Sequence, residues 1–423
     1  MKSIKKTWPL LTALLFISSP VLAQQTNEEP VEIKDRTPVE DMQARRDGLL
    51  NVYTESLIRL PKRIPQDLVY DSGVDIPYPE DGVKGIFVPG HSASDETTLN
   101  NLVDFISSTD LNSIVIDVKE DYGNIVLDIE ADGEFEEYIN NALVADNDPA
   151  EILSLLDEHD IYPIARVVTF KDTMLATERP DLSFREADGS VWKNGNGEAF
   201  VNPYEKEVWE YTLDIAKKAA RLGFKDIQFD YVRFPEGFEV FDETLTYSRG
   251  DYEDSDLTAG EQRMSAVNDF VKYAREELRP FGVETSVDVF GYAAFIREAP
   301  GIGQSFLGIS EHVDSISAMI YPSHWGPGNF NVPKPDLEPY DTIDGYMELE
   351  NELLAELEEN APRSRPWIQD FTASYLGAGN FKEYQAEDVT AQIQALYDNG
   401  VEEYLIWNAT GDYSRDAKFK ITE

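Results

Sequence analysis

The stretch GFKDIQFDYVRFP, residues 223–235, sets the fold class expected for this chain. It begins as a strand with two-residue alternation, so Ile227 and Phe229 would point to one face and Gln228 and Asp230 to the other. An amphipathic helix pattern precedes it, which indicates a buried strand of an α/β unit. A carboxylate inside such a sheet is costly unless it has a partner or a function. Because parallel barrels carry their active sites at the carboxyl ends of their strands, Asp230 is a candidate functional residue.

Strand and helix patterns alternate from residue 83 onward. Eight units of this kind predict a (β/α)8 TIM barrel. A doubly wound open sheet is the alternative, but no phosphate-binding glycine fingerprint follows the first strand. The expected strands are VKGIFVPG (83–90), NSIVIDVK (112–119), YPIARVVTF (162–170), FKDIQFDYV (224–232), VETSVDVF (283–290), VDSISAMIY (313–321), RPWIQDF (365–371) and EEYLIWNA (402–409). The main expected helices are 96–108, 149–159, 205–221, 262–279, 346–359 and 386–399.

Long connections follow three of the expected strands, at 171–203, 236–260 and 322–345, whereas the connections from helix to strand are short. Barrel enzymes build their active sites from the loops that follow the strands. This asymmetry predicts that the carboxyl ends of the strands form the functional face.

The composition excludes several classes of site and partner. With 36 basic and 81 acidic residues the chain carries a net charge of −45, which argues against nucleic acid and anionic membranes as partners. The acidic residues are spread along the chain, as expected of an adaptation for solubility. The chain has no cysteine, so disulfides, thiolate catalysis and cysteine-bound zinc are excluded.

The N-terminal residues 1–23 have the pattern of a bacterial export signal, with a lysine-rich start, an apolar run at 8–17 and Ala23 at the cleavage position. The apolar run is short for a membrane span, and a retained anchor is the alternative. Cleavage predicts a periplasmic or secreted protein. Residues 24–82 are expected to be a linker and extended lead-in that wraps or tethers the domain, and residues 83–423 the barrel.

Three aspartates end expected strands four, five and seven. Alternation on strand five turns Asp288 toward the barrel interior, beside Asp230, whereas alternation alone does not decide between Gln369 and Asp370 on strand seven. We expect Asp230, Asp288 and Asp370 to meet at one mouth of the barrel. Glycosidic bond hydrolysis needs one protonated and one ionised carboxyl group, and crowded carboxylates have pKa values that move apart in this way. Salt bridges that serve only the structure are the alternative.

Further candidate residues lie at or just beyond the strand ends. Asp117 and Lys119 are expected to share the inner face of strand two, and basic side chains would hold the carboxylates in their charge states. Aromatic rings there would stack on the apolar faces of sugars, although packing under the long loops is the alternative. The expected substrate-binding residues are Asp117, Lys119, Arg166, Tyr231, Arg233, Tyr321, His324, Trp325, Gln369, Trp407 and Asn408.

Several motifs occur in order through the barrel: VKGIFVPGHSA, NSIVIDVKEDYG, FVNPY, GFKDIQFDYVRFP, DVFGY, MIYPSHW and WIQDF. With them the chain resembles a glycoside hydrolase family that was formerly a domain of unknown function and is related to the α-amylase-type barrels. The resemblance implies a barrel glycosidase, in which the nucleophile position matches Asp230 and a further aspartate matches Asp370. Two departures weaken the case for α-glucan chemistry, since Asp288 stands where those barrels have Glu and Gln228 where they have Arg.

The expected function is an exported glycoside hydrolase that cleaves a polysaccharide, such as a cell-envelope or exopolysaccharide chain. Asp230 is the expected nucleophile or principal carboxylate and Asp288 the expected acid/base. Asp370 and Asp117 would bind sugar hydroxyls or stabilise the developing cationic ring. No cofactor or metal is expected. The alternatives are a glycan-binding barrel without turnover and a hydrolase that uses the aspartates as ligands for a divalent ion.

Overall fold

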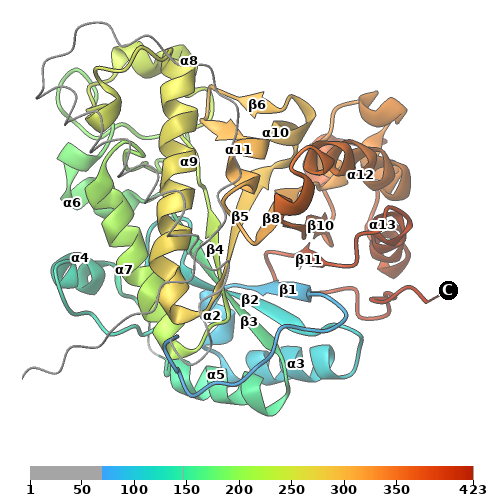
Figure 1. Ribbon diagram of the computed structural model, residues 1–423. Helices are drawn as coiled ribbons and strands as arrows, with labels where there is room; N and C mark the ends of the chain where they lie inside the picture. Colours follow the sequence, from blue (N-terminus) through green and yellow to red (C-terminus); the bar gives the residue numbers. More distant parts are fainter. Residues whose placement is uncertain (1–68, 146, 423) are drawn as a thin grey trace, which may run out of the picture. The chain divides into compact units, whose positions relative to one another are not determined.

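The computed structural model describes residues 69–145 and 147–422, so the expected export signal and most of the lead-in lie outside the described residues. Eight parallel strands form a closed barrel, with helices between successive strands (Figure 1). Trp367 pairs with Met319 and closes the ring between its seventh and sixth strands. The predicted (β/α)8 barrel is therefore confirmed. In chain order the strands are β1 (Lys84–Val88), β2 (Ser113–Lys119), β3 (Tyr162–Val168), β4 (Asp226–Asp230), β5 (Glu284–Phe290), β8 (Ser315–Met319), β10 (Trp367–Gln369) and β11 (Tyr404–Trp407).

The helices begin where the sequence offers capping residues. The side chain of Asp95 accepts a hydrogen bond from the first turn of α3, and Thr258 forms a capping box with Glu261 at the start of α9. Helix α12 begins at Pro339, seven residues before the expected 346, because proline suits the first turn of a helix. The main helices are α3 (Glu96–Ser107), α5 (Pro149–Glu158), α7 (Lys206–Leu222), α9 (Ala259–Leu278), α12 (Pro339–Ala355) and α13 (Ala386–Asp398).

Shorter elements complete the fold around this frame. The strands β6 (Glu298–Ala299) and β7 (Gln304–Ser305) form a small hairpin, and β9 (Arg363–Ser364) pairs with β8. The short helices are α2 (Gly90–Ala93), α4 (Glu136–Ala142), α6 (Thr173–Glu178), α8 (Phe238–Phe241), α10 (Gly291–Phe295) and α11 (Phe306–Ser310).

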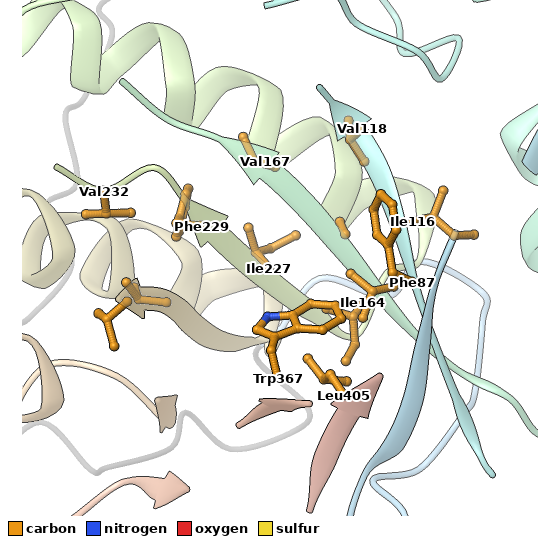
Figure 2. Close-up of a cluster of buried hydrophobic side chains, with 14 of the residues drawn as sticks. Phe87, Ile116, Val118, Ile164, Val167, Ile227, Phe229, Val232, Trp367 and Leu405 are labelled. Atoms are coloured by element: carbon orange, nitrogen blue, oxygen red, sulfur yellow. The ribbon is translucent and has the colours of Figure 1, made fainter. Parts of the chain in front are cut away.

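The strands bury apolar side chains on both faces. On the outer face, the ring of Phe229 in β4 packs against Phe270 in α9, with ring centroids 5.4 Å apart. On the inner face, Trp367 lies among apolar side chains from β1, β3 and β11 (Figure 2). This alternation along β4 is the one predicted from residues 223–235, and it turns Gln228 and Asp230 inward.

The described end of the lead-in packs against the amino-terminal end of the barrel. The Tyr70 amide donates to the carbonyl of Pro280 just before β5, and the Tyr78 hydroxyl donates to Glu403 just before β11. Gly223, which ends α7 at a φ of 123°, lies under this segment, where an added Cβ would collide with Val74. The lead-in therefore closes the end of the barrel opposite the long loops.

Candidate active site

A cavity of about 300 Å³ opens at the carboxyl ends of the barrel strands. Phe290, Met319 and Trp407 are the last residues of their strands and line its wall. This is the end of the barrel that the loop lengths predict as the functional face. The lining residues are Asp121, Arg166, Asp230, Tyr231, Arg233, Glu236, Asp288, Phe290, Met319, Tyr321, His324, Trp367, Phe371 and Trp407.

Arg166 on β3 binds three carboxylates at the base of the cavity. Its Nε and Nη2 atoms donate to Asp230 Oδ2 at 3.0 and 2.6 Å, and Nη1 donates to Asp117 Oδ1 at 2.7 Å. Nη2 also donates to Asp121 Oδ1 at 2.7 Å. The strand register places these groups together, because Asp117 lies opposite Arg166, and Asp230 lies opposite a residue two positions further along β3. One guanidinium thus holds three acidic side chains from two strands and a loop.

The two carboxylates that share Arg166 with Asp230 differ in charge state. Complete burial raises the pKa of Asp117 to about 7, although Arg166 acts in the opposite direction. Burial would also raise the pKa of Asp121, but Arg166 and Lys171 outweigh it and hold that pKa well below its usual range. Asp121 therefore stays ionised at the cavity wall, and Asp117 titrates near neutrality behind Arg166.

Asp288 on β5 has no cationic partner of this kind. Its Oδ1 atom accepts a hydrogen bond from the indole N–H of Trp367 at 2.8 Å. Burial, followed by the negative charge of Asp230, raises the pKa of Asp288 well above its usual range. The cavity thus combines an arginine-paired carboxylate on β4 with a neighbouring carboxyl group that favours its protonated form.

Tyr231 follows Asp230 with a φ of 51°, a conformation that is costly for a residue with a side chain. In this conformation its amide donates to Asp230 Oδ1 at 2.6 Å, and its hydroxyl donates to Asp121 Oδ2 at 3.0 Å. Lys171 lies 4.6 Å from the centre of the ring and pairs with Glu198 at 2.9 Å. The strained residue therefore connects Asp230 with the loop that follows β3.

Arg233 forms a second fixed cation in the cavity wall. Its guanidinium lies 4.6 Å from the ring centre of Phe290 and 4.8 Å from that of Tyr231. Its ion-pair partner, Glu236 at 3.2 Å, has a side chain that is 72% exposed. Arg233 is held mainly by aromatic packing, and Glu236 reaches the cavity from the loop after β4.

Other predicted residues are also brought to the cavity. Tyr321 and Trp407 line it as expected, and His324 lies at its rim with Nδ1 3.1 Å from the hydroxyl of Ser323. Trp407 stacks on Phe87, with ring centroids 4.1 Å apart. The aromatic side of the cavity therefore comes from strands on opposite sides of the barrel.

Lys119 does not share the inner face with Asp117, and this prediction was wrong. The pairing of β2 with β3 shifts register between the two residues, which turns Lys119 toward the helix layer. There its ammonium group pairs with Asp172 at 2.7 Å and lies 5.7 Å from the ring centre of Tyr211 in α7.

Asp370 is not brought to the cavity with Asp230 and Asp288. Its two carboxylate oxygens accept hydrogen bonds from the amide and hydroxyl of Ser414, both at 2.7 Å. The side chain of Asn408 donates to the carbonyl of Asp370 at 2.6 Å. Asp370 and Asn408 therefore tie the C-terminal segment to the barrel.

Gln369 and Trp325 also lie outside the cavity lining. The Gln369 side chain accepts from the Ser323 amide at 3.0 Å and donates to Asp336 at 3.0 Å, so it braces the loop after β8. Trp325 packs on Phe330, with ring centroids 4.7 Å apart.

Sequence analysis missed Asp121 and Glu236 among the polar residues of the cavity. Both follow the carboxyl end of a strand, by two residues for Asp121 and six for Glu236. An acidic residue at that position was the available signal, but loop conformation decides whether it turns inward.

Among residues 69–145 and 147–422, no cluster of three or more histidine, aspartate or glutamate side chains could hold a metal ion. At the cavity the guanidinium of Arg166 provides the positive charge between the aspartates. The same described residues contain no helix with the length and apolar character needed to cross a bilayer.

A family model described as "Putative glycosyl hydrolase domain" matches residues 85–413. The chain belongs to this family. The matched range includes every residue that lines the cavity. The expected glycoside hydrolase family and its barrel are thereby confirmed, and the family supports glycan hydrolysis as the general activity. No curated protein matches the chain.

Solved structures share the fold of this family member. The glycoside hydrolase domain of PgaB (BpsB) from Bordetella bronchiseptica is 12% identical, with a TM-score of 0.55 over 78% of this chain and 95% of that one. A β-galactosidase from Halorubrum lacusprofundi is 11% identical, with a TM-score of 0.52 over 78% of this chain and 56% of that one. A hypothetical protein from Ruminiclostridium thermocellum is 29% identical, with a TM-score of 0.41 over 48% of this chain and 97% of that one.

Proposed function

We propose that the protein is an exported glycoside hydrolase in which Asp230 and Asp288 divide the catalytic work. The observation that carries the proposal is the contrast between the two aspartates in one cavity. Asp230 accepts two hydrogen bonds from Arg166, which favour a carboxylate. Asp288 is buried beside that negative charge, and its pKa is raised. One carboxylate and one carboxylic acid are the pair that glycosidic bond cleavage requires.

In the proposed reaction Asp288 donates its proton to the glycosidic oxygen as the bond from that oxygen to the anomeric carbon breaks. Asp230 then either attacks the anomeric carbon, which retains its configuration after a later attack by water, or takes a proton from an attacking water, which inverts it. In the retaining case Asp288, now ionised, activates the second water. Arg166 keeps Asp230 ionised and oriented, and Trp367 orients Asp288.

The proposed substrate is a polysaccharide outside the cytoplasm, such as a cell-envelope or exopolysaccharide chain. The export pattern at residues 1–23 supports this location, and the protein recovered outside the cytoplasm should begin at Gln24. Aromatic rings that line the cavity, including Tyr321, Trp367 and Trp407, suit the apolar faces of sugars.

The experiment is release of reducing ends from a panel of bacterial and plant polysaccharides, with wild type beside Asp230→Asn. We expect release by wild type and a loss of roughly a hundredfold or more in the variant, the scale of a lost catalytic carboxyl group. Asp251→Asn, an exposed change on the loop after β4, is the matched control and should retain activity. If wild type releases nothing while both proteins bind an immobilised glycan equally, the protein is a glycan-binding barrel instead.

A further inference from the structure

The short helix α10, which follows β5 directly beyond the cavity wall, has its large apolar side chains on the outside (Figure 1). It buries Ala293 and Ala294 and exposes Tyr292, Phe295 and the C-capping residue Ile296, which are 38%, 46% and 50% exposed. A helix that only packed on the barrel would bury its large residues and expose its small ones. We call Tyr292, Phe295 and Ile296 the aromatic shelf.

The aromatic shelf continues the wall of the cavity. Phe290 lines the cavity at the end of β5, and the ring of Tyr292 lies nearly parallel to it, with centroids 5.4 Å apart and planes at 19–25° of each other by its 24° angle. Arg233, also in the cavity wall, lies 4.6 Å from the ring centre of Phe290. The apolar surface therefore runs without interruption from the cavity to the exposed ring of Tyr292.

On the side away from Phe290, the shelf is supported by the loop after β8. The ring of Phe295 packs edge-on against Phe330 at 5.8 Å and lies 6.1 Å from the ring of Trp325. These contacts fix the position of α10 without covering its outer face. The hydroxyl of Tyr292 makes no hydrogen bond within residues 69–145 and 147–422, so it is free to bind a polar group on a ligand.

The size of the cavity requires additional surface if the substrate is a polymer. At about 300 Å³ it stands at the lower end of ligand pockets, which range over roughly 300–1,000 Å³. Only a short part of a polysaccharide fits beside Asp230 and Asp288, and the remaining sugars must lie on the rim. An exposed ring with a free hydroxyl suits a sugar, whose faces are apolar and whose edges carry hydroxyl groups.

We propose that the aromatic shelf binds the sugars of a polysaccharide on either side of the cleavage point, so that the protein acts on chains of several sugars. This inference rests on the proposed function, because it assigns a longer substrate to the same site. It predicts that removal of a shelf ring weakens binding of long chains more than binding of short ones.

The test uses oligosaccharides of increasing length from the glycan that wild type cleaves best. For Tyr292→Ala and Phe295→Ala we expect the loss in kcat/KM to grow with chain length and reach about tenfold on the longest, mainly through KM. Tyr70→Ala is the matched control, because Tyr70 is 47% exposed and lies at the opposite end of the barrel. An equal loss at every length, or no loss, overturns the inference.

Binding separates this inference from the proposed function. If wild type cleaves no glycan but binds an immobilised polysaccharide, and Tyr292→Ala binds it more weakly, the shelf is a glycan site and only the hydrolysis proposal fails. If wild type neither cleaves nor binds any glycan, both fail. If Tyr292→Ala converts a dimer to a monomer in light scattering with glycan binding intact, the shelf is an interface between copies and the inference is overturned.

Discussion

The barrel interior contains two buried arginine–aspartate pairs, one near each end. At the carboxyl end Arg166 pairs with Asp230 at 2.6 Å, and near the amino end Arg365 pairs with Asp226 at the same distance. The Arg365–Asp226 side chains are completely buried, and Ser286 also donates to Asp226 at 2.7 Å. The Arg166–Asp230 pair lines a cavity instead.

The difference between the two ends lies in the balance of charge and in access. Arg365 has one ionised partner in a sealed environment, which is a structural arrangement. Arg166 has three, with a further raised-pKa carboxyl group, Asp288, on the next strand. Residue types alone would not distinguish the pairs. An excess of acid over base beside a cavity is what indicates chemistry.

The largest expected effect comes from breaking the amino-end pair. Asp226→Ala leaves Arg365 buried without its ion-pair partner, which should lower the free energy of unfolding by about 3–5 kcal/mol, measured by chemical denaturation. Because Asp226 is far from the cavity lining, kcat/KM per folded molecule should remain that of wild type.

A double variant sharpens this result. Asp226→Leu with Arg365→Met removes both charges and should recover much of the lost stability, since apolar side chains replace buried pairs well. If Asp226→Ala unfolds no more easily than wild type, or loses activity while folded, the amino-end pair is not purely structural.

A smaller effect is expected from Asp117, which lies behind Arg166. A folded-state pKa of about 7, above the unfolded value of about 3.9, means that Asp117 contributes stability fully below about pH 4 and loses it as the pH rises through about 7. The upper bound is about 4 kcal/mol, from roughly 1.4 kcal/mol for each pKa unit.

Asp117→Asn should remove this dependence while its side-chain oxygen still accepts the hydrogen bond from Arg166. The measurement is the melting temperature of wild type and variant between pH 4 and 8. We expect wild type to lose stability relative to the variant across this interval. Parallel curves would show that Asp117 is ionised throughout, as a simple partner of Arg166.

The fold could be predicted from sequence because local and global signals agree. Each of the eight barrel strands lies within an expected stretch, since alternation of apolar residues marks buried strands independently of their neighbours. The inward direction of Asp230 and Asp288 followed from the same alternation.

The remainder of the site depends on features that alternation does not encode. A one-residue irregularity between Asp117 and Lys119 reversed the direction of Lys119. Asp370 was expected at the mouth, but its oxygens meet Ser414, a residue 44 positions later in the chain. Asp121 and Glu236 reach the cavity from loops, whose conformation is set by distant contacts such as that of Arg166 with Asp121.

The central claim is that Asp230 is ionised and Asp288 protonated at neutral pH, and infrared spectroscopy tests it without knowledge of the substrate. The measurement is the difference spectrum of wild type minus Asp288→Asn at pH 7, in the region of the carboxylic acid C=O stretch. The account predicts a positive carboxylic acid band from Asp288. A difference spectrum that shows a lost carboxylate and no acid band would mean that Asp288 is ionised, and would contradict the account.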